Sequence, residues 1–239
     1  MSSRCFFGVN GLDQIIPQGM EYGTQILVSG DTGVGKTVLA GQFLIEGLLC
    51  GDTCIYVSCD EPPAVMRRRL RDYKVGVTAY ENAGQLILVD AYEEEESREK
   101  YFIVNQYSLE KYAVMERLLL QRFSGRRLRL VVDSLSTLLI PFAQEDILEF
   151  HRNRLKYLRK NRVLTMDIMV DGVLDQRLMT IAGHLYNVTV RMKFGGSEGR
   201  PDRMIQVGKV KSGRFDAVPR RFGISPVFGI IIYTADMEV

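Results

Sequence analysis

The sequence contains little of what metal-chelating or disulfide-bonded proteins require. Its 239 residues include four cysteines, none of them in a CxxC pair, and only two histidines, His151 and His184, which lie far apart in the chain. Three of the cysteines lie in apolar segments, where a thiol is more often packed than reactive. We therefore expect reduced, structural cysteines and no metal site built from cysteine and histidine.

Long apolar runs and an excess of charge of one sign are also missing. A membrane-spanning helix needs about 18 or more consecutive apolar residues, and the first twenty residues do not combine a basic start with a long apolar run. We therefore expect a cytoplasmic protein with no membrane insertion. Because 31 Lys+Arg face 29 Asp+Glu, the net charge of +2 is too small to attract nucleic acid by bulk electrostatics, and any DNA contact needs a local basic patch.

The pattern of apolar residues predicts an α/β fold in one domain over residues 1–239. Hydrophobic residues make up 46% of the chain and charged residues 25%, as in ordinary globular proteins, and no composition shift marks a boundary. Strand-like runs are residues 25–29, 54–59, 86–90, 128–133 and 163–170, and helical patterns between them are residues 36–49, a segment opened by Pro62 and Pro63, 108–123 and 145–162. This alternation predicts a mainly parallel twisted sheet with helices on both faces. Residues 188–194, 204–210 and 228–234 read as antiparallel strands that extend the sheet.

The strongest chemical signal is GDTGVGKT at residues 30–37, which fits the phosphate-loop pattern GxxxxGK[ST] between a predicted strand and a predicted helix. Its glycines let backbone N–H groups surround phosphate oxygens, and the start of the following helix adds a positive dipole end. Lys36 is expected to reach the β and γ phosphates of ATP, and the Thr37 hydroxyl to ligate Mg²⁺. The residues expected to bind the nucleotide are Gly30, Asp31, Thr32, Gly33, Val34, Gly35, Lys36, Thr37 and Val38.

Two further strands end in acidic residues. Asp133 ends an apolar strand and is the expected metal-site carboxylate, although an aspartate there could also cap the next segment. Asp60 and Glu61 follow an earlier strand, where a carboxylate would stand near the γ-phosphate and could activate the attacking water. The alternative is an acidic helix start ahead of two prolines, with no catalytic role.

Taken together, these segments resemble the KaiC-like branch of the RecA-type ATPases, which includes archaeal RadA paralogs. GVNGLDQIIPQGMEYG from Gly8 resembles the lead-in of that family, CIYVSCDE its strand ending in a catalytic carboxylate, and RLRLVVDSLS its metal-binding strand. QVGKVKSG followed by FGI resembles its C-terminal hairpin. The resemblance implies an ATPase in which Glu61 activates water, while Lys209 and Lys211 reach the nucleotide of a neighbouring subunit in a hexameric ring.

The chain departs from the family pattern at two places. The strand VLTMDIMVD ends with Met169, Val170 and Asp171, where relatives usually carry a small polar residue or Gln that senses the γ-phosphate. The second basic residue of the hairpin is Lys211 rather than the commoner Arg, and it offers a point charge instead of a fork. We therefore expect slow turnover.

Three classes of function fit these features. The first is an ATP-driven oligomeric switch, and the second is a RadA-like recombination accessory that binds single-stranded DNA. The two segments that bind DNA in RecA-type proteins, here residues 139–146 and 171–177, contain only one basic residue between them, Arg177. The third is a non-hydrolysing ATP-binding subunit of a larger machine such as the archaeal motility motor.

Two basic clusters remain open to interpretation. Arg67, Arg68, Arg69 and Arg71 are spread around more than one face of a predicted helix, which favours solvated surface charge over a partner or nucleic-acid contact. Lys209 and Lys211 alternate along a strand, and we therefore expect both side chains on the same face. They either solvate an exposed ribbon or act on an adjoining subunit, since the rest of the predicted site supplies no other cation for the charge that develops on the γ-phosphate.

Overall fold

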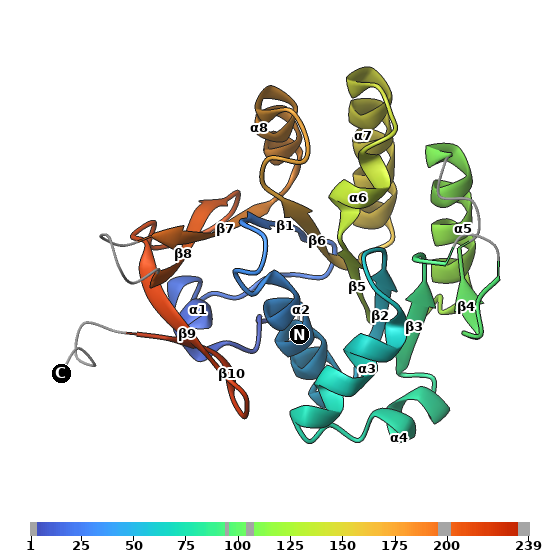
Figure 1. Cartoon of the computed structure of the whole chain (residues 1–239), viewed down its shortest axis with the longest axis horizontal. Helices are drawn as coiled ribbons and strands as arrows, with labels where there is room; N and C mark the ends of the chain where they lie inside the picture. The colour runs from blue at the N-terminus through green and yellow to red at the C-terminus, as the bar shows by residue number, and fades with distance from the viewer. Residues whose placement is uncertain (1–3, 94–95, 104–107, 196–201, 234–239) are drawn as a thin grey trace.

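A ten-stranded sheet organises the part of the chain that the computed structural model describes, residues 4–93, 96–103, 108–195 and 202–233 (Figure 1). The strand order is β10-β9-β8-β7-β1-β6-β5-β2-β3-β4. The strands are β1 (Gln25–Gly30), β2 (Thr53–Ser58), β3 (Leu86–Asp90), β4 (Tyr101–Phe102), β5 (Leu128–Asp133), β6 (Leu164–Val170), β7 (Val188–Gly195), β8 (Asp202–Val210), β9 (Arg220–Ser225) and β10 (Gly229–Ile232).

Parallel and antiparallel pairing divide this sheet as the sequence predicts, except at β7: the sequence predicts an antiparallel strand over residues 188–194, but β7 pairs in parallel with β1 because helix α8 (Gln176–Leu185) makes a crossover before it. β1 pairs in parallel with β6 on one side and β7 on the other, and β5, β2, β3 and β4 continue in parallel beyond β6. β8, β9 and β10 then add to β7 in antiparallel order. The carboxyl ends of β1, β5 and β2 therefore meet at one edge of the sheet, which is where ligands bind in folds of this kind.

Helices cover both faces of the sheet. They are α1 (Asn10–Ile15), α2 (Lys36–Leu49), α3 (Pro63–Asp72) and α4 (Val77–Asn82), which share the core of one face, and α5 (Leu109–Arg122), α6 (Leu135–Leu139), α7 (Gln144–Lys160) and α8 (Gln176–Leu185), which lie on the other. Within β1 the side chains alternate between the two cores: Ile26 and Val28 pack on the α2 side and Leu27 on the opposite side. All six residues of β1, β2 and β5 are buried, which explains their nearly continuous apolar sequences.

The predicted element boundaries equal those of the structure at α2, β3 and β5, and the agreement is poorest in the short elements. The sequence did not reveal α1, α4, α6, α8, β4 or β9. In α8 only Leu178 and Ala182 are buried, so its apolar periodicity is weak, and Asp175 starts it by accepting hydrogen bonds from the N–H groups of Arg177 and Leu178. The last predicted strand is observed as β10, which ends at Ile232, and Thr234 lies outside the described residues.

A buried arginine attaches the segment before β1 to the sheet. Arg129, on β5, donates from Nε to Asp52 at 2.7 Å and from Nη1 to the carbonyl oxygens of Phe6 and Phe43. The Tyr22 hydroxyl donates to the other oxygen of Asp52 at 2.5 Å. This network holds the lead-in against α2 and β5. No helix in the described ranges is long and apolar enough to cross a bilayer.

Candidate functional site

The predicted phosphate loop joins β1 to α2 through glycines in left-handed backbone conformations. Gly33 has φ +76° and Gly35 has φ +116°, values that side chains other than glycine seldom adopt. A Cβ atom at Gly35 would lie 2.7 Å from Cδ1 of Ile224 on β9, whereas one at Gly33 would meet no atom within 4 Å. The loop therefore leaves open space above Gly33, at the start of a 14-residue helix whose dipole favours an anion.

Lys36 is held against the same loop. Its side chain is nearly fully buried, and Nζ donates to the carbonyl oxygens of Gly30 at 2.8 Å and Asp31 at 2.7 Å. Burial lowers the pKa of Lys36, and the acidic side chains around it, led by Asp133 and Asp171, oppose that shift. The cation is thus held by neutral backbone oxygens, and it forms no ion pair with any residue in the described ranges.

Asp133 lies at the carboxyl end of β5 and is only 5% exposed. It accepts a hydrogen bond from the Tyr56 hydroxyl at 3.0 Å and one from Thr37. Burial raises the pKa of Asp133 to about 6, although these two hydrogen bonds lower it. A carboxylate oxygen beside a threonine hydroxyl at the start of the phosphate-loop helix is a donor set that suits Mg²⁺, a cation that prefers oxygen ligands.

Asp60 and Glu61 follow β2, which pairs with β5 so that Ser58 lies beside Asp133. The two acids differ in their surroundings, because Asp60 is exposed whereas the Glu61 side chain is 33% exposed and forms an ion pair with Arg69 of α3. The Ser58 hydroxyl donates to the Glu61 carbonyl oxygen at 2.5 Å. Glu61 is therefore held both at its backbone and at its carboxylate.

The unusual end of β6 also adjoins the phosphate loop. The Asp171 N–H donates to the Gly30 carbonyl oxygen at 3.0 Å, and the Asp171 carboxylate lies 3.9 Å from Nζ of Lys193. Of the three residues that depart from the family pattern, Met169 and Val170 are apolar and Met169 is buried. Asp171 is the charged one, and its carboxylate acts on the pKa of Lys36.

Lys209 and Lys211 share a face, as their alternation predicts, and both reach the carboxyl end of α8. Nζ of Lys209 donates to the carbonyl oxygens of Gly183 at 2.8 Å and His184 at 3.1 Å, and Nζ of Lys211 to that of Leu185 at 3.3 Å. Cations at a helix carboxyl end satisfy its last carbonyl groups. Within this chain the two ammonium groups are thus bonded to the end of α8, and their action across subunits stays a prediction.

Two residues of the site were missed in the sequence. Tyr56 lies inside an apolar strand, where a tyrosine reads as core, and only the pairing of β2 with β5 brings its hydroxyl to Asp133. Arg69 was interpreted as part of a solvated cluster. The structure separates that cluster, because Arg67 pairs with Glu81 and Glu99, Arg69 pairs with Glu61, and Arg68 and Arg71 are exposed.

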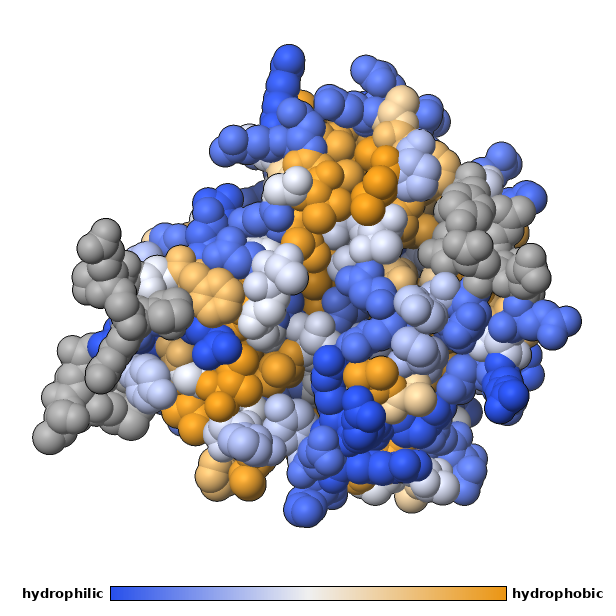
Figure 2. Space-filling view, in the orientation of Figure 1, coloured by the Kyte–Doolittle hydropathy of each residue, from blue (hydrophilic) through white to orange (hydrophobic). Residues whose placement is uncertain are grey.

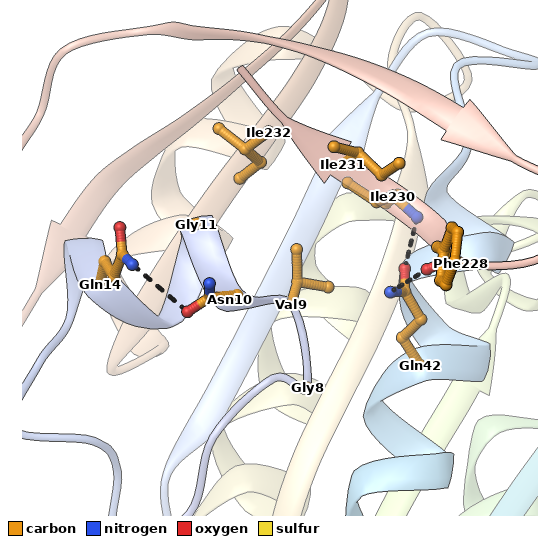
Figure 3. Close-up of a pocket in the computed structure, with 10 residues that line it drawn as sticks. All are labelled: Gly8, Val9, Asn10, Gly11, Gln14, Gln42, Phe228, Ile230, Ile231 and Ile232. Atoms are coloured by element: carbon orange, nitrogen blue, oxygen red, sulfur yellow. Dashed lines mark hydrogen bonds between the residues drawn. The ribbon is translucent and has the colours of Figure 1, made fainter. Parts of the chain in front are cut away.

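A separate hollow of about 490 Å³ lies between α1, α2 and β10 (Figure 3). Gln42, one and a half turns after Lys36, donates to the Phe228 carbonyl oxygen at 3.1 Å and accepts from the Ile230 N–H at 2.8 Å. Because the described residues that line this hollow include no charged side chain and none from the phosphate loop, it does not suit a triphosphate. Gln42 instead fastens the β9–β10 hairpin to the phosphate-loop helix.

Comparisons with known proteins bear on the fold and the family. The model of the ATPase family KaiC matches residues 6–237. A UPF0273 protein of Pyrococcus horikoshii is 31% identical over 159 residues, 64% of each chain, and one of Pyrobaculum aerophilum is 33% identical over 134 residues, 54% of this chain and 47% of the relative. The circadian clock protein KaiC3 of Synechocystis is 34% identical over 84 residues, 35% of this chain and 17% of KaiC3. The chain thus spans less than two thirds of these relatives.

A solved structure supports the same fold. The crystal structure of a KaiC-like protein from Pyrococcus horikoshii superimposes with a TM-score of 0.80 at 21% identity, covering 98% of this chain and all of that one. At that identity the match concerns the fold alone: a mainly parallel sheet with a C-terminal antiparallel extension.

Proposed function

This chain belongs to the KaiC ATPase family, and from that premise we propose that it binds ATP with Mg²⁺, hydrolyses the nucleotide slowly, and acts as an oligomeric nucleotide-dependent switch. Family membership accounts for an ATP-binding protein of RecA-like fold. The metal dependence, the turnover and the switching are the proposal, and they rest on the arrangement of side chains around the phosphate loop.

One observation supports the proposal: the three strand ends that carry the proposed phosphate cradle, metal carboxylate and base lie at one edge of the sheet. Gly30 ends β1, Asp133 ends β5, and Glu61 follows β2. Thr37 and Asp133, already joined by a hydrogen bond, would hold Mg²⁺, which supplies charge neutralisation to the phosphates when bound. The backbone of residues 30–38 would bind the phosphates.

The chain's own side chains suggest how hydrolysis would proceed. Lys36 would exchange the carbonyl oxygens of Gly30 and Asp31 for phosphate oxygens, whose negative charge makes them stronger acceptors. The Glu61 carboxylate would orient the attacking water and accept its proton.

The oligomeric part of the proposal concerns Lys209 and Lys211. Among the described residues their ammonium groups donate to carbonyl oxygens of residues 183–185 alone, and both side chains lie near the surface. We infer that they serve a neighbouring subunit's γ-phosphate, in an assembly such as the hexameric ring that the family resemblance implies.

Lys36→Ala tests nucleotide binding. At a ligand concentration of 100 times the dissociation constant, binding stabilises a protein by about 2.7 kcal/mol, so ATP with Mg²⁺ should raise the melting temperature of the wild-type protein clearly. Lys36→Ala should lose that rise, whereas Lys156→Ala, which removes an exposed lysine on α7, should keep it. Unchanged ATP affinity of Lys36→Ala in calorimetry would contradict the assignment of the phosphate loop.

The same protein preparation separates the other two function classes. Salt-dependent binding of fluorescent single-stranded DNA in a titration would support the role as a recombination accessory. ATP binding without measurable turnover would support the non-hydrolysing subunit. We expect turnover and weak or no DNA binding, because residues 139–146 and 171–177 carry one basic residue between them.

A further inference from the structure

The ion pair between Glu61 and Arg69 sets one arginine of α3 apart from its neighbours. α3 carries Arg67, Arg68, Arg69 and Arg71, and the space-filling view shows a strongly hydrophilic surface over this helix (Figure 2). Arg67 pairs with Glu81 at 2.8 Å and Glu99 at 2.8 Å, an arrangement that joins α3 to the segments after it. Arg69 alone among the four points back toward the end of β2, to the candidate base.

Helix geometry explains how Arg69 reaches Glu61 across eight positions. Side chains on a helix tilt toward its amino end, and α3 begins at Pro63, directly after the loop that carries Glu61. At about 1.5 Å per residue, six residues of helix separate Pro63 from Arg69 by roughly 9 Å, a distance that a long arginine side chain directed toward the amino end largely covers. Met66 and Leu70 fix the helix by burying its other face.

The ion pair lies beside the metal-site carboxylate. Burial raises the pKa of Tyr56, whose hydroxyl donates to Asp133, and among the smaller contributions Glu61 adds to that rise while Arg69 opposes it. Arg69 also opposes the rise that burial causes in the pKa of Asp133. The guanidinium charge is therefore felt by Tyr56 and Asp133 as well as by Glu61, at the edge of the sheet where the phosphate loop ends.

We propose that Arg69 is a positioning residue for ATP hydrolysis, which holds the Glu61 carboxylate at the edge of the sheet beside Asp133 and acts on turnover through that carboxylate. The inference rests on the proposed function, because it needs Glu61 to be the base. Two anchors fix Glu61 in place, since Ser58 holds its backbone carbonyl group and Arg69 holds its carboxylate. Removing the second anchor leaves the base free to rotate into solvent, because a third of its side chain is already exposed.

Removing Arg69 should change the rate of ATP hydrolysis and not the affinity for ATP. In the described part of the chain Arg69 forms no hydrogen bond or ion pair with a residue of the phosphate loop, so ATP binding should not depend on it. A catalytic group displaced by about 1 Å can lose roughly 10²-fold in rate, because the reacting atoms no longer meet in the productive geometry. We therefore expect Arg69→Ala to lower kcat by at least about tenfold while the Kd for ATP changes less than about twofold.

Matched variants separate positioning from a general loss of charge or fold. Arg68→Ala removes an exposed arginine from the same helix and should leave kcat unchanged. Arg69→Lys keeps one charged donor and should recover part of the rate. Thermal unfolding without nucleotide checks the fold, and Arg69→Gln serves if the alanine variant is destabilised.

A double-mutant cycle with Glu61→Gln tests whether Arg69 acts through Glu61. In the Glu61→Gln background Arg69→Ala should cause no further loss, because the group that it positions is gone. An unchanged or raised kcat in Arg69→Ala, or the same fractional loss in both backgrounds, would overturn the positioning role while leaving the ATPase assignment intact. If the wild-type protein binds ATP without turnover, or if Glu61→Gln turns over as fast as wild type, the proposed catalytic function fails first and this inference fails with it.

Discussion

Arg154 on α7 and Lys36 at the start of α2 are both almost completely buried, yet their charges are matched in different ways. Arg154 donates to both carboxylate oxygens of Glu116 at 2.9–3.0 Å and to both of Asp167 at 2.6 and 3.0 Å. Lys36 donates to two backbone carbonyl oxygens. The first cation is enclosed by charges of opposite sign, and the second is held by neutral acceptors.

The difference separates a structural charge cluster from the proposed phosphate-binding site. The guanidinium of Arg154 forms two-pronged contacts, and Tyr186 donates a further hydrogen bond to Asp167 at 2.7 Å, so the cluster has little capacity left for a ligand. A lysine on carbonyl oxygens can exchange them for an anionic oxygen and gain Coulomb energy. Lys209 and Lys211 resemble Lys36 in this respect and not Arg154.

The largest effect should come from breaking the structural cluster. Arg154→Met leaves the carboxylates of Glu116 and Asp167 buried without their cation, and removing one member of such a cluster costs about 3–5 kcal/mol of unfolding free energy. Arg152→Met, at an exposed position on the same helix, should cost less than about 0.5 kcal/mol. Denaturant unfolding of both variants provides the measurement, and a loss below about 1 kcal/mol for Arg154→Met would contradict the structural role.

Sequence patterns identified the phosphate loop but not this charge cluster. The motif at residues 30–37, the apolar spacing after it and Gly51 beyond it gave the bounds of α2 as observed, Lys36–Leu49. Asp167 lies within a run of apolar residues, and no spacing rule connects it to Arg154 thirteen residues earlier. Pairing between side chains on different elements depends on packing, which a single sequence does not display.

In the candidate site, too, the sequence alone did not reveal which side chains from different elements pair with one another. Asp133 and Glu61 were predictable because each follows a recognisable strand, and parallel strands end at a common edge. Tyr56 and Arg69 were not, since their roles depend on the β2–β5 register and on where α3 points. The motif residues thus emerge from the sequence, and the residues that orient them emerge only from the fold.

An intermediate effect should appear in the pH dependence of stability, through a histidine beside the structural cluster. His151 is fully buried, its Nδ1 lies 3.4 Å from the Tyr186 hydroxyl, and burial lowers its pKa to about 4. The unfolded chain binds a proton near pH 6.5 and the folded protein only near pH 4. The contribution of neutral His151 to the unfolding free energy is therefore fully present above pH 6.5, and it is lost as the pH falls from there toward 4.

Unfolding free energies at pH 7 and pH 5 measure this contribution. The loss on going to pH 5 should be about 2 kcal/mol greater for the wild-type protein than for His151→Phe, which cannot titrate. Any stability change that the substitution causes at both pH values cancels in this difference. Equal pH dependence of the two proteins would show that His151 takes up a proton in the folded state as readily as in the unfolded one.

The smallest effect is expected at Lys209 and Lys211, the two lysines that, like Lys36, are held by carbonyl oxygens. Lys209→Ala/Lys211→Ala removes cations that we expect to leave α8 for a neighbour's γ-phosphate, and it should lower turnover by about tenfold, less than the roughly 10³-fold or more that in-trans arginines provide. Wild-type specific activity should rise with protein concentration as subunits associate. Concentration-independent activity in a strictly monomeric sample would exclude a role across subunits.

Mixing variants distinguishes a neighbour's lysines from lysines that act within their own subunit. Glu61→Gln subunits keep both lysines and lack the base, whereas Lys209→Ala/Lys211→Ala subunits keep the base and lack the lysines. If the lysines act in trans, a mixed interface joins an intact base to intact lysines, and the mixture should turn over faster than either variant alone. If they act in cis, or only hold the end of α8, no pairing restores a complete site and the mixture gives the average of its parts. Because the lysines' present partners are the last carbonyl groups of α8, the double variant's melting temperature also has to be measured, so that a loosened helix is not mistaken for a lost catalytic charge.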